Sequence, residues 1–156
     1  SSLSGIALWR AADLYLGAQE PRKALELYDE AAERLFVLGF PTEAIDVLER
    51  TERLAAGHRR RSWFASRLAR AHLAAGNTER ALTFAQVVCD TGRPDDPDAI
   101  RDSVLAECVR AEASLKLARD AENTIKSILE LATDESLAVE QRRLLCLYGI
   151  RLAASA

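Results

Sequence analysis

The chain has 156 residues, of which 49% are apolar and 29% charged, and its formal net charge is −3. This composition is typical of one folded domain and excludes an intrinsically disordered chain. The near balance of 21 basic and 24 acidic side chains gives no general attraction to nucleic acid or to anionic lipid. No apolar run reaches the roughly 20 residues that a membrane span needs. We therefore expect neither nucleic-acid binding nor a membrane span.

The chain contains three cysteines, Cys89, Cys108 and Cys146, with no CxxC pair. An odd number at this spacing fits neither a secreted disulfide framework nor a zinc site. Each cysteine lies in an apolar helical pattern, where a free cysteine acts as a small hydrophobic residue. We expect three reduced, buried cysteines in a cytoplasmic protein.

The sequence has no methionine and no signal-peptide pattern, and its last residues continue a helix-like stretch. We interpret it as part of a longer protein. We therefore expect that some functional residues of that protein lie in segments outside this chain.

Helices are predicted along the whole chain, because Ala, Leu, Glu and Arg dominate and apolar residues recur at helical spacing. The eight expected helices are 4–16, 22–38, 42–56, 61–75, 78–91, 98–118, 121–132 and 136–153. Stop and start signals separate them at Gly39-Phe40-Pro41-Thr42, Gly76-Asn77-Thr78 and Asp95-Asp96-Pro97. Connections this short predict that neighbouring helices run antiparallel.

One spacing recurs in the sequence: a bulky residue, a glycine four residues later, and a small residue five further on. Its instances are Leu35, Gly39 and Ala44; His72, Gly76 and Ala81; and Leu115, Arg119 and Thr124, where the glycine is lost. Small side chains at these places let two helix backbones approach closely, while the bulky side chains fill the neighbouring gaps. The pattern predicts a repeated helix hairpin.

This pattern resembles the tetratricopeptide (TPR) family, whose repeat is a helix–turn–helix of 34 residues. The resemblance implies an all-α, α-α superhelix (solenoid) of antiparallel helix hairpins, formed by a single domain, 1–156. Its hairpins would be 22–56, 61–91 and 98–132, with flanking helices 4–16 and 136–153. The chain departs from the family in two ways: the anchors Ala44, Ala81 and Thr124 lie 37 and 43 residues apart, and the consensus Trp and closing Pro are missing. Helix 4–16 also fits the pattern, so a second register stays open.

In the TPR family the first helix of each unit lines a concave groove that holds a peptide or a partner surface. The resemblance places groove residues at Glu26, Asp29, Glu33 and Phe36, at Trp63, Ser66, Arg70 and Leu73, and at Ala106, Val109, Ala113 and Lys116. Trp63 beside Arg70 would be an anchor for a partner, since Trp and Arg dominate interface hot spots. The alternative is that Trp63 packs between helices. Asp29 and Glu33 would repel the carboxylate that chaperone-binding members of the family clamp, so we do not expect that activity.

A basic cluster, His58-Arg59-Arg60-Arg61, is followed by Arg67 and Arg70. It is either a contact for an acidic peptide or a phosphate backbone, or a solvated linker. Because Trp63 and Phe64 are the only aromatic residues beside it, the pattern does not favour base stacking.

Catalytic motifs such as HExxH, a glycine-rich phosphate loop or GxSxG do not occur, and His72 falls on a packing position of the repeat. We expect no enzyme activity, no catalytic residue, no cofactor and no metal site. The leading hypothesis is a protein-interaction, scaffold or sensor module of a larger, bacterial regulatory protein. The alternatives are a regulatory domain that binds a small ligand in the groove, and a segment that forms a homodimer through helix 4–16 or helix 136–153.

Overall fold

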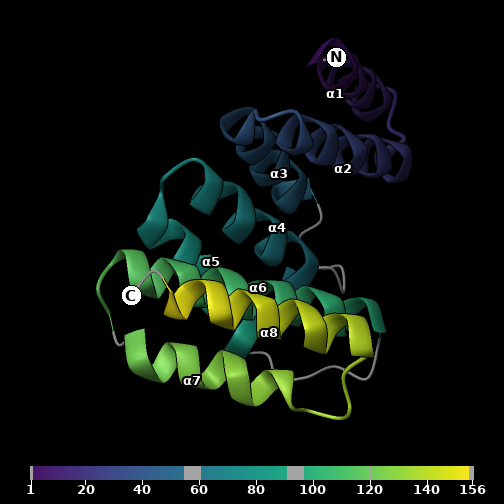
Figure 1. Cartoon of the computed structure of the whole chain (residues 1–156). Coiled ribbons are helices and arrows are strands. Elements are labelled where there is room, and N and C mark those ends of the chain that lie inside the picture. Colours follow the sequence, from purple (N-terminus) through teal and green to yellow (C-terminus); the bar gives the residue numbers. More distant parts are fainter. Residues whose placement is uncertain (1, 55–60, 91–96, 120, 155–156) are drawn as a thin grey trace.

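A computed structural model describes residues 2–54, 61–90, 97–119 and 121–154 of the chain. In these residues the fold is all-α, with no strand, and neighbouring helices form a solenoid of hairpins (Figure 1). The helices are α1 (Ser2–Gly17), α2 (Pro21–Val37), α3 (Pro41–Leu54), α4 (Arg61–Ala74), α5 (Thr78–Asp90), α6 (Pro97–Lys116), α7 (Ala121–Ala132) and α8 (Val139–Ala153). The predicted fold class, with about eight helices, is confirmed.

Four of the turns between helices share one backbone conformation. Gln19, Gly39, Gly76 and Ala118 each have a positive φ, between 52° and 85°. In each turn the next residue donates its backbone N–H to a carbonyl five residues earlier, as from Phe40 to Leu35 (2.9 Å). This is the αL ending that satisfies the last carbonyls of a helix. Glycine at the second and third turns is what the sequence signals predicted, since glycine adopts a positive φ without a steric cost.

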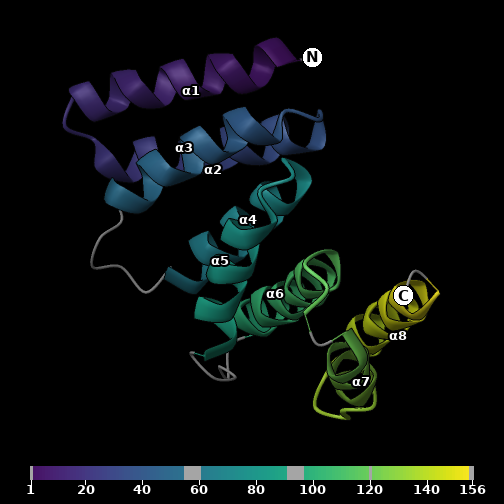
Figure 2. The ribbon, with the colours of Figure 1, turned by 90° about the vertical axis from the view of Figure 1, so that its left-hand side faces the viewer.

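The stack of hairpins is curved. The even-numbered helices α4, α6 and α8 pack against one another in succession, whereas α3 and α5, and α5 and α7, make little or no contact in the described part of the chain. Helices α4, α6 and α8 therefore line the shorter, inner side, which we call the inner face, and α2 joins them through ion pairs of Asp29 and Glu33 with α4. Figure 2 shows the progression from α1 to the α7–α8 pair at the other end.

The core follows the stack as a series of buried clusters. Its first part joins α1 to α4 through residues such as Tyr28, Val47 and Leu68, all fully buried. Its last part joins α6, α7 and α8 through residues such as Ile128 and Leu145. Each hairpin buries its apolar side only against its neighbours, as in repeat proteins generally.

The third hairpin departs from the predicted spacing by one residue. The αL residue there is Ala118, and not Arg119 as the pattern predicted. On α7, the pattern counted from Thr124 still places its next core position at Ile128, which is buried. On α6, every assigned position moves by one residue and so turns by about 100° around the helix. One extra residue between the αL residue and α7 accounts for both observations.

Candidate functional site

Side chains of α2, α4 and α6 meet on the inner face through Arg67. Its Nε lies 3.8 Å from Asp29 Oδ1 on α2, and its Nη1 donates to Asp102 Oδ1 on α6 at 3.4 Å. Asp102 is buried, and burial raises the pKa of its carboxyl above the ordinary value despite the attraction of Arg67. Burial likewise lowers the pKa of the Arg67 guanidinium, against the attraction of Asp29 and Asp102. One arginine therefore ties three inner helices together.

A second arginine repeats this arrangement between α2 and α4. Arg70 donates to Glu33, and its guanidinium carbon lies 4.0 Å from the centre of the Phe36 ring. The Arg67 guanidinium lies in the same way 3.7 Å from the centre of a Trp63 ring. Arginine stacks well on aromatic faces because its cation is planar and weakly hydrated. The inner face at α2 and α4 thus presents two arginine–aromatic pairs.

A polar pair also joins α6 to α8. Tyr148 on α8 donates to Glu112 on α6, which also accepts from Lys116 Nζ at 2.9 Å. Burial would raise the pKa of Glu112, but the hydrogen bonds from Tyr148 and Lys116 bring it below its ordinary value. Counted back from Ala118, Glu112 takes the position that Glu33 has on α2 and Arg70 on α4. Each inner helix is therefore joined to the next by at least one polar pair. We call the series Asp29–Arg67, Glu33–Arg70, Arg67–Asp102 and Glu112–Tyr148 the inner-face ladder.

The predicted groove residues divide between the surface and the core. Glu26 is exposed, whereas Asp29, Glu33, Phe36, Trp63 and Arg70 are half-buried and lie close together on α2 and α4. Lys116 is exposed at the end of α6. By contrast, Ser66 and Leu73 are buried, and so they offer little surface to a partner.

The groove positions predicted on α6 need correction. Ala106, Val109 and Ala113 are buried against α4 and α5 instead of lying on the inner face. The cause is the shift of one residue described above, which rotates each of them toward the preceding hairpin. Glu112, which the groove prediction did not include, lies on the inner face in their place.

The expected burial of the three cysteines agrees with the structure only in part. Cys108 is buried, but Cys89 is half-buried and Cys146 is exposed, because Cys146 lies on the side of α8 that no described helix covers. The expectation of three buried cysteines is therefore wrong for Cys146.

Of the predicted basic cluster, residues 58–60 and the side chain of Arg61 lie outside the described residues. Arg67 and Arg70 belong to the inner-face ladder and do not form a free basic patch.

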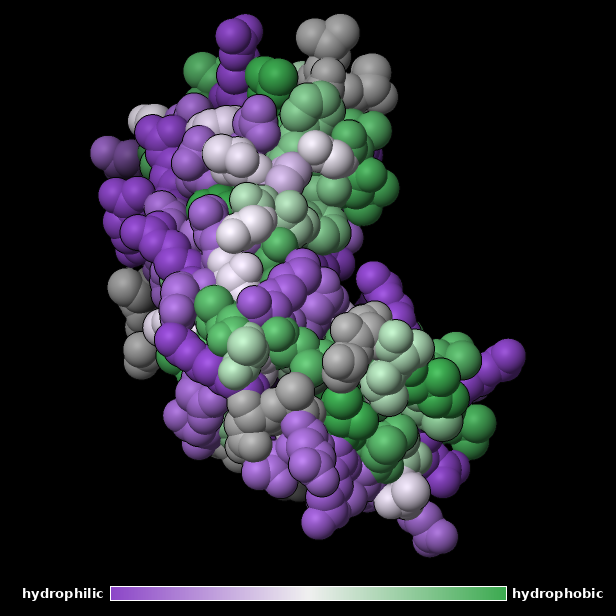
Figure 3. Space-filling view, turned by 60° about the vertical axis from the view of Figure 1, so that its left-hand side comes forward, coloured by the Kyte–Doolittle hydropathy of each residue, from purple (hydrophilic) through white to green (hydrophobic). Residues whose placement is uncertain are grey.

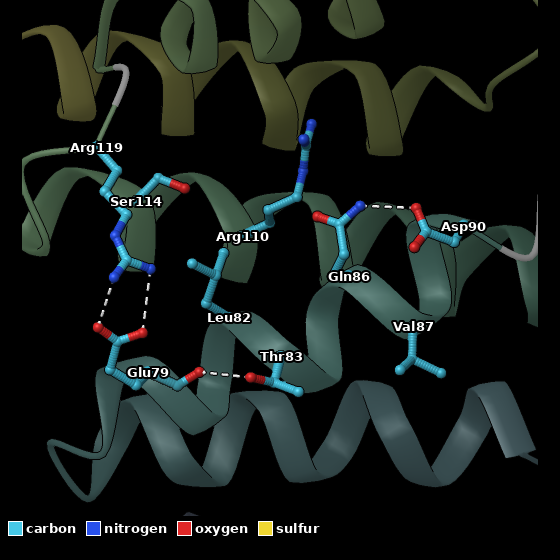
Figure 4. A pocket seen from close by; sticks show the side chains of 9 residues that line it. All are labelled: Glu79, Leu82, Thr83, Gln86, Val87, Asp90, Arg110, Ser114 and Arg119. Atoms are coloured by element: carbon cyan, nitrogen blue, oxygen red, sulfur yellow. Dashed lines mark hydrogen bonds and ion pairs between the residues drawn. The ribbon is translucent and has the colours of Figure 1, made fainter.

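A depression of about 540 Å³ lies on the outer side, between α5 and α6 (Figure 4). Leu82 and Val87 contribute apolar surface, and charged residues surround them. Arg119 donates two hydrogen bonds to Glu79, at 3.1 and 2.8 Å, and Gln86 donates to Asp90 at 2.7 Å. The depression is open. Arg119 and Glu79 pair across one end of it, whereas Gln86 and Asp90 pair along α5.

The surface shows where apolar side chains gather. In Figure 3 the molecule is hollowed on one side, with hydrophobic surface above and below the hollow and hydrophilic surface on the opposite side. Large exposed apolar side chains occur at the α2–α3 turn (Val37, Leu38 and Phe40) and on α8 (Leu144, Leu147 and Ile150). The sequence pattern did not single out either group.

Comparison of the chain with family models, with curated proteins and with solved structures gives no match. Membership of the TPR family therefore stays a prediction drawn from the sequence pattern. None of the described helices combines the length and the hydropathy needed to cross a bilayer. Within the same residues, His, Cys, Asp and Glu side chains nowhere gather in threes that would suit a metal ion.

Proposed function

We propose that this chain is a protein-interaction module of a larger protein, and that it binds a peptide or a partner surface on its inner face. The observation that carries this proposal is the pair of arginine–aromatic stacks, Arg67 on Trp63 and Arg70 on Phe36. Arginine and tryptophan contribute most of the energy in many protein interfaces. A guanidinium that is already fixed on a ring loses little conformational entropy when a partner binds.

The charges of this region favour a partner of mixed charge. Arg70 is paired with Glu33, but its own side chain is 28% exposed, so an acidic side chain of the partner can also reach the guanidinium. Glu26 is exposed one turn from Asp29 and would accept a basic group. An extended segment or a helix that presents both signs therefore fits this surface better than a strongly acidic one.

A screen of displayed peptides against the whole chain tests the proposal. Peptides that bind are compared on the wild type, on Phe36→Ala and Arg70→Ala, and on the outer-face control Lys126→Ala. We expect each inner-face variant to weaken binding at least tenfold and the control to leave it unchanged. Circular dichroism and thermal unfolding confirm that each variant is folded. Peptide binding that is equally strong in all variants, or no binding peptide at all, contradicts the proposal.

A further inference from the structure

The two sides of α8 differ in what they contact. Leu145, Gly149 and Leu152 are buried against the rest of the stack. A β-carbon on Gly149 would lie 2.8 Å from Leu129 Cδ2, so α7 and α8 approach closely there. On the opposite side Leu144 and Leu147 are 52% and 58% exposed. Figure 2 shows the α7–α8 pair at the end of the stack, where no other described helix lies over this side.

The exposed side of α8 follows the spacing of a helix–helix seam. Glu140, Leu144, Leu147 and Arg151 are separated by four, three and four residues. This is the alternation of the a and d positions of a coiled coil, which brings the four side chains into one narrow stripe. All four side chains are exposed. The stripe places two leucines in the middle, an acid at one end and a base at the other.

Such a stripe is complementary to a copy of itself that runs in the opposite direction. In an antiparallel pair, residues at equal distances on either side of the midpoint between Leu144 and Leu147 face each other. Leu144 of one copy then meets Leu147 of the other, and Glu140 meets Arg151. Each of these contacts occurs twice, as a twofold interface requires. All four layers are matched, two apolar and two of opposite charge.

We propose that a second copy of this chain docks on α8, so that two α8 helices pair antiparallel through Glu140, Leu144, Leu147 and Arg151. A parallel pair would place Glu140 against Glu140 and Arg151 against Arg151, which is unfavourable. In the antiparallel pair, the positive N-terminal end of each helix dipole also lies beside the negative C-terminal end of the other.

The residues beside the stripe are compatible with this pairing. Ile150, 58% exposed, and Arg143 flank it on the same side of the helix. In the antiparallel pair Arg143 of one copy lies near Ile150 of the other, where its aliphatic stem covers the apolar side chain. The positive charge of Arg151 also helps to lower the pKa of Glu112 in its own chain. In the dimer Arg151 is therefore attracted by two acidic groups. The seam is short, so we expect a reversible dimer that dissociates on dilution.

Two charge-reversed variants test the pairing in the whole chain. Glu140→Arg places arginine against arginine in both outer layers, and Arg151→Glu places glutamate against glutamate. We expect each variant alone to sediment as a monomer at concentrations where the wild type is a dimer. A mixture of the two variants matches every layer again. We expect the mixture to regain the dimer, which a merely misfolded variant would not do.

Further variants separate this interface from others. Leu147→Glu should abolish the dimer, whereas Leu14→Glu on α1, where the side chain is 76% exposed, should leave it intact. A wild type that stays monomeric across the concentration series overturns the proposal. So does a dimer that Leu14→Glu abolishes, or open-ended assemblies, because a twofold pair closes at two copies. The outcome is independent of peptide binding on the inner face, which involves different residues.

Discussion

Arg67 on α4 donates to Asp102 on α6 across 35 residues of sequence, and the carboxylate that it reaches is almost completely buried. The same guanidinium lies on Trp63 and faces Asp29 of α2. Because a buried carboxylate without a partner is costly, this arginine is expected to matter for stability as well as for the shape of the inner face.

Replacing Arg67 by methionine should lower the free energy of unfolding by about 2 kcal/mol, because Asp102 loses its cation while staying buried. The double variant Arg67→Met/Asp102→Leu should be more stable than the single one, since it removes the unpaired charge. Urea unfolding measures both. Arg80→Met, at an exposed ion pair with Glu49, is the matched control and should change stability by less than about 0.5 kcal/mol. A double variant less stable than Arg67→Met would count against a role for the buried charge.

His72 should make stability depend on pH. It is buried, its ring stacks on Phe84 with the centres 5.4 Å apart, and burial lowers its pKa below the ordinary 6.5. The unfolded chain therefore takes up a proton at a higher pH than the folded chain. The stabilisation from the neutral imidazole is fully present above pH 6.5 and is lost as the pH falls below that value.

The variant His72→Phe should remove this dependence. It keeps the ring against Phe84 and eliminates the buried Nε2, which has no hydrogen-bond partner. Urea unfolding at pH values above and below 6.5 should show a smaller loss of stability on acidification than in the wild type. If both proteins lose the same amount, another group causes the dependence.

Two glycines of α1 should respond oppositely to alanine. A β-carbon on Gly5 would lie 2.9 Å from Leu35 Cγ, and the side chain of Leu35 is buried in the core. Gly5→Ala should therefore destabilise the protein by about 1 kcal/mol or more. At Gly17 no atom lies within 4 Å of the added carbon. Gly17→Ala should leave stability unchanged or raise it by up to about 1 kcal/mol through helix propensity. Thermal unfolding of both variants decides whether α1 packs as closely as described.

Ala118 holds a conformation that suits glycine. Its φ of 52° is sterically unfavourable for a residue with a β-carbon. Ala118→Gly should raise the free energy of unfolding by roughly 0.5–1 kcal/mol, the gain being limited by the greater freedom of glycine in the unfolded chain. Gly76→Ala, at the corresponding turn with φ 81°, should lower it by about 1 kcal/mol. A stabilising Gly76→Ala would mean that the turn tolerates other conformations.

The sequence alone was enough to predict the helices and the two turns that contain glycine. Gly39 and Gly76 lie at αL helix ends, as their spacing predicted, because helix-ending signals act within a few residues. On α2, α3 and α7, where apolar and polar residues separate most clearly, the apolar period likewise identifies the side that is buried. The order of short connections then predicts a stack of antiparallel hairpins, which the structure confirms.

The tertiary structure was needed to decide which side of α6 faces which neighbour. The turn between α6 and α7 lacks glycine, and Ala118 gives no sequence signal for its αL conformation. Because the position of this turn was predicted one residue too late, Val109 was assigned to the groove although it lies in the core. The ladder pairs, such as Arg67 with Asp102, join residues far apart in the sequence, so no local pattern predicts them. Hydrogen bonding within a helix is local, whereas the rotation of one helix against another depends on the packing of all its neighbours.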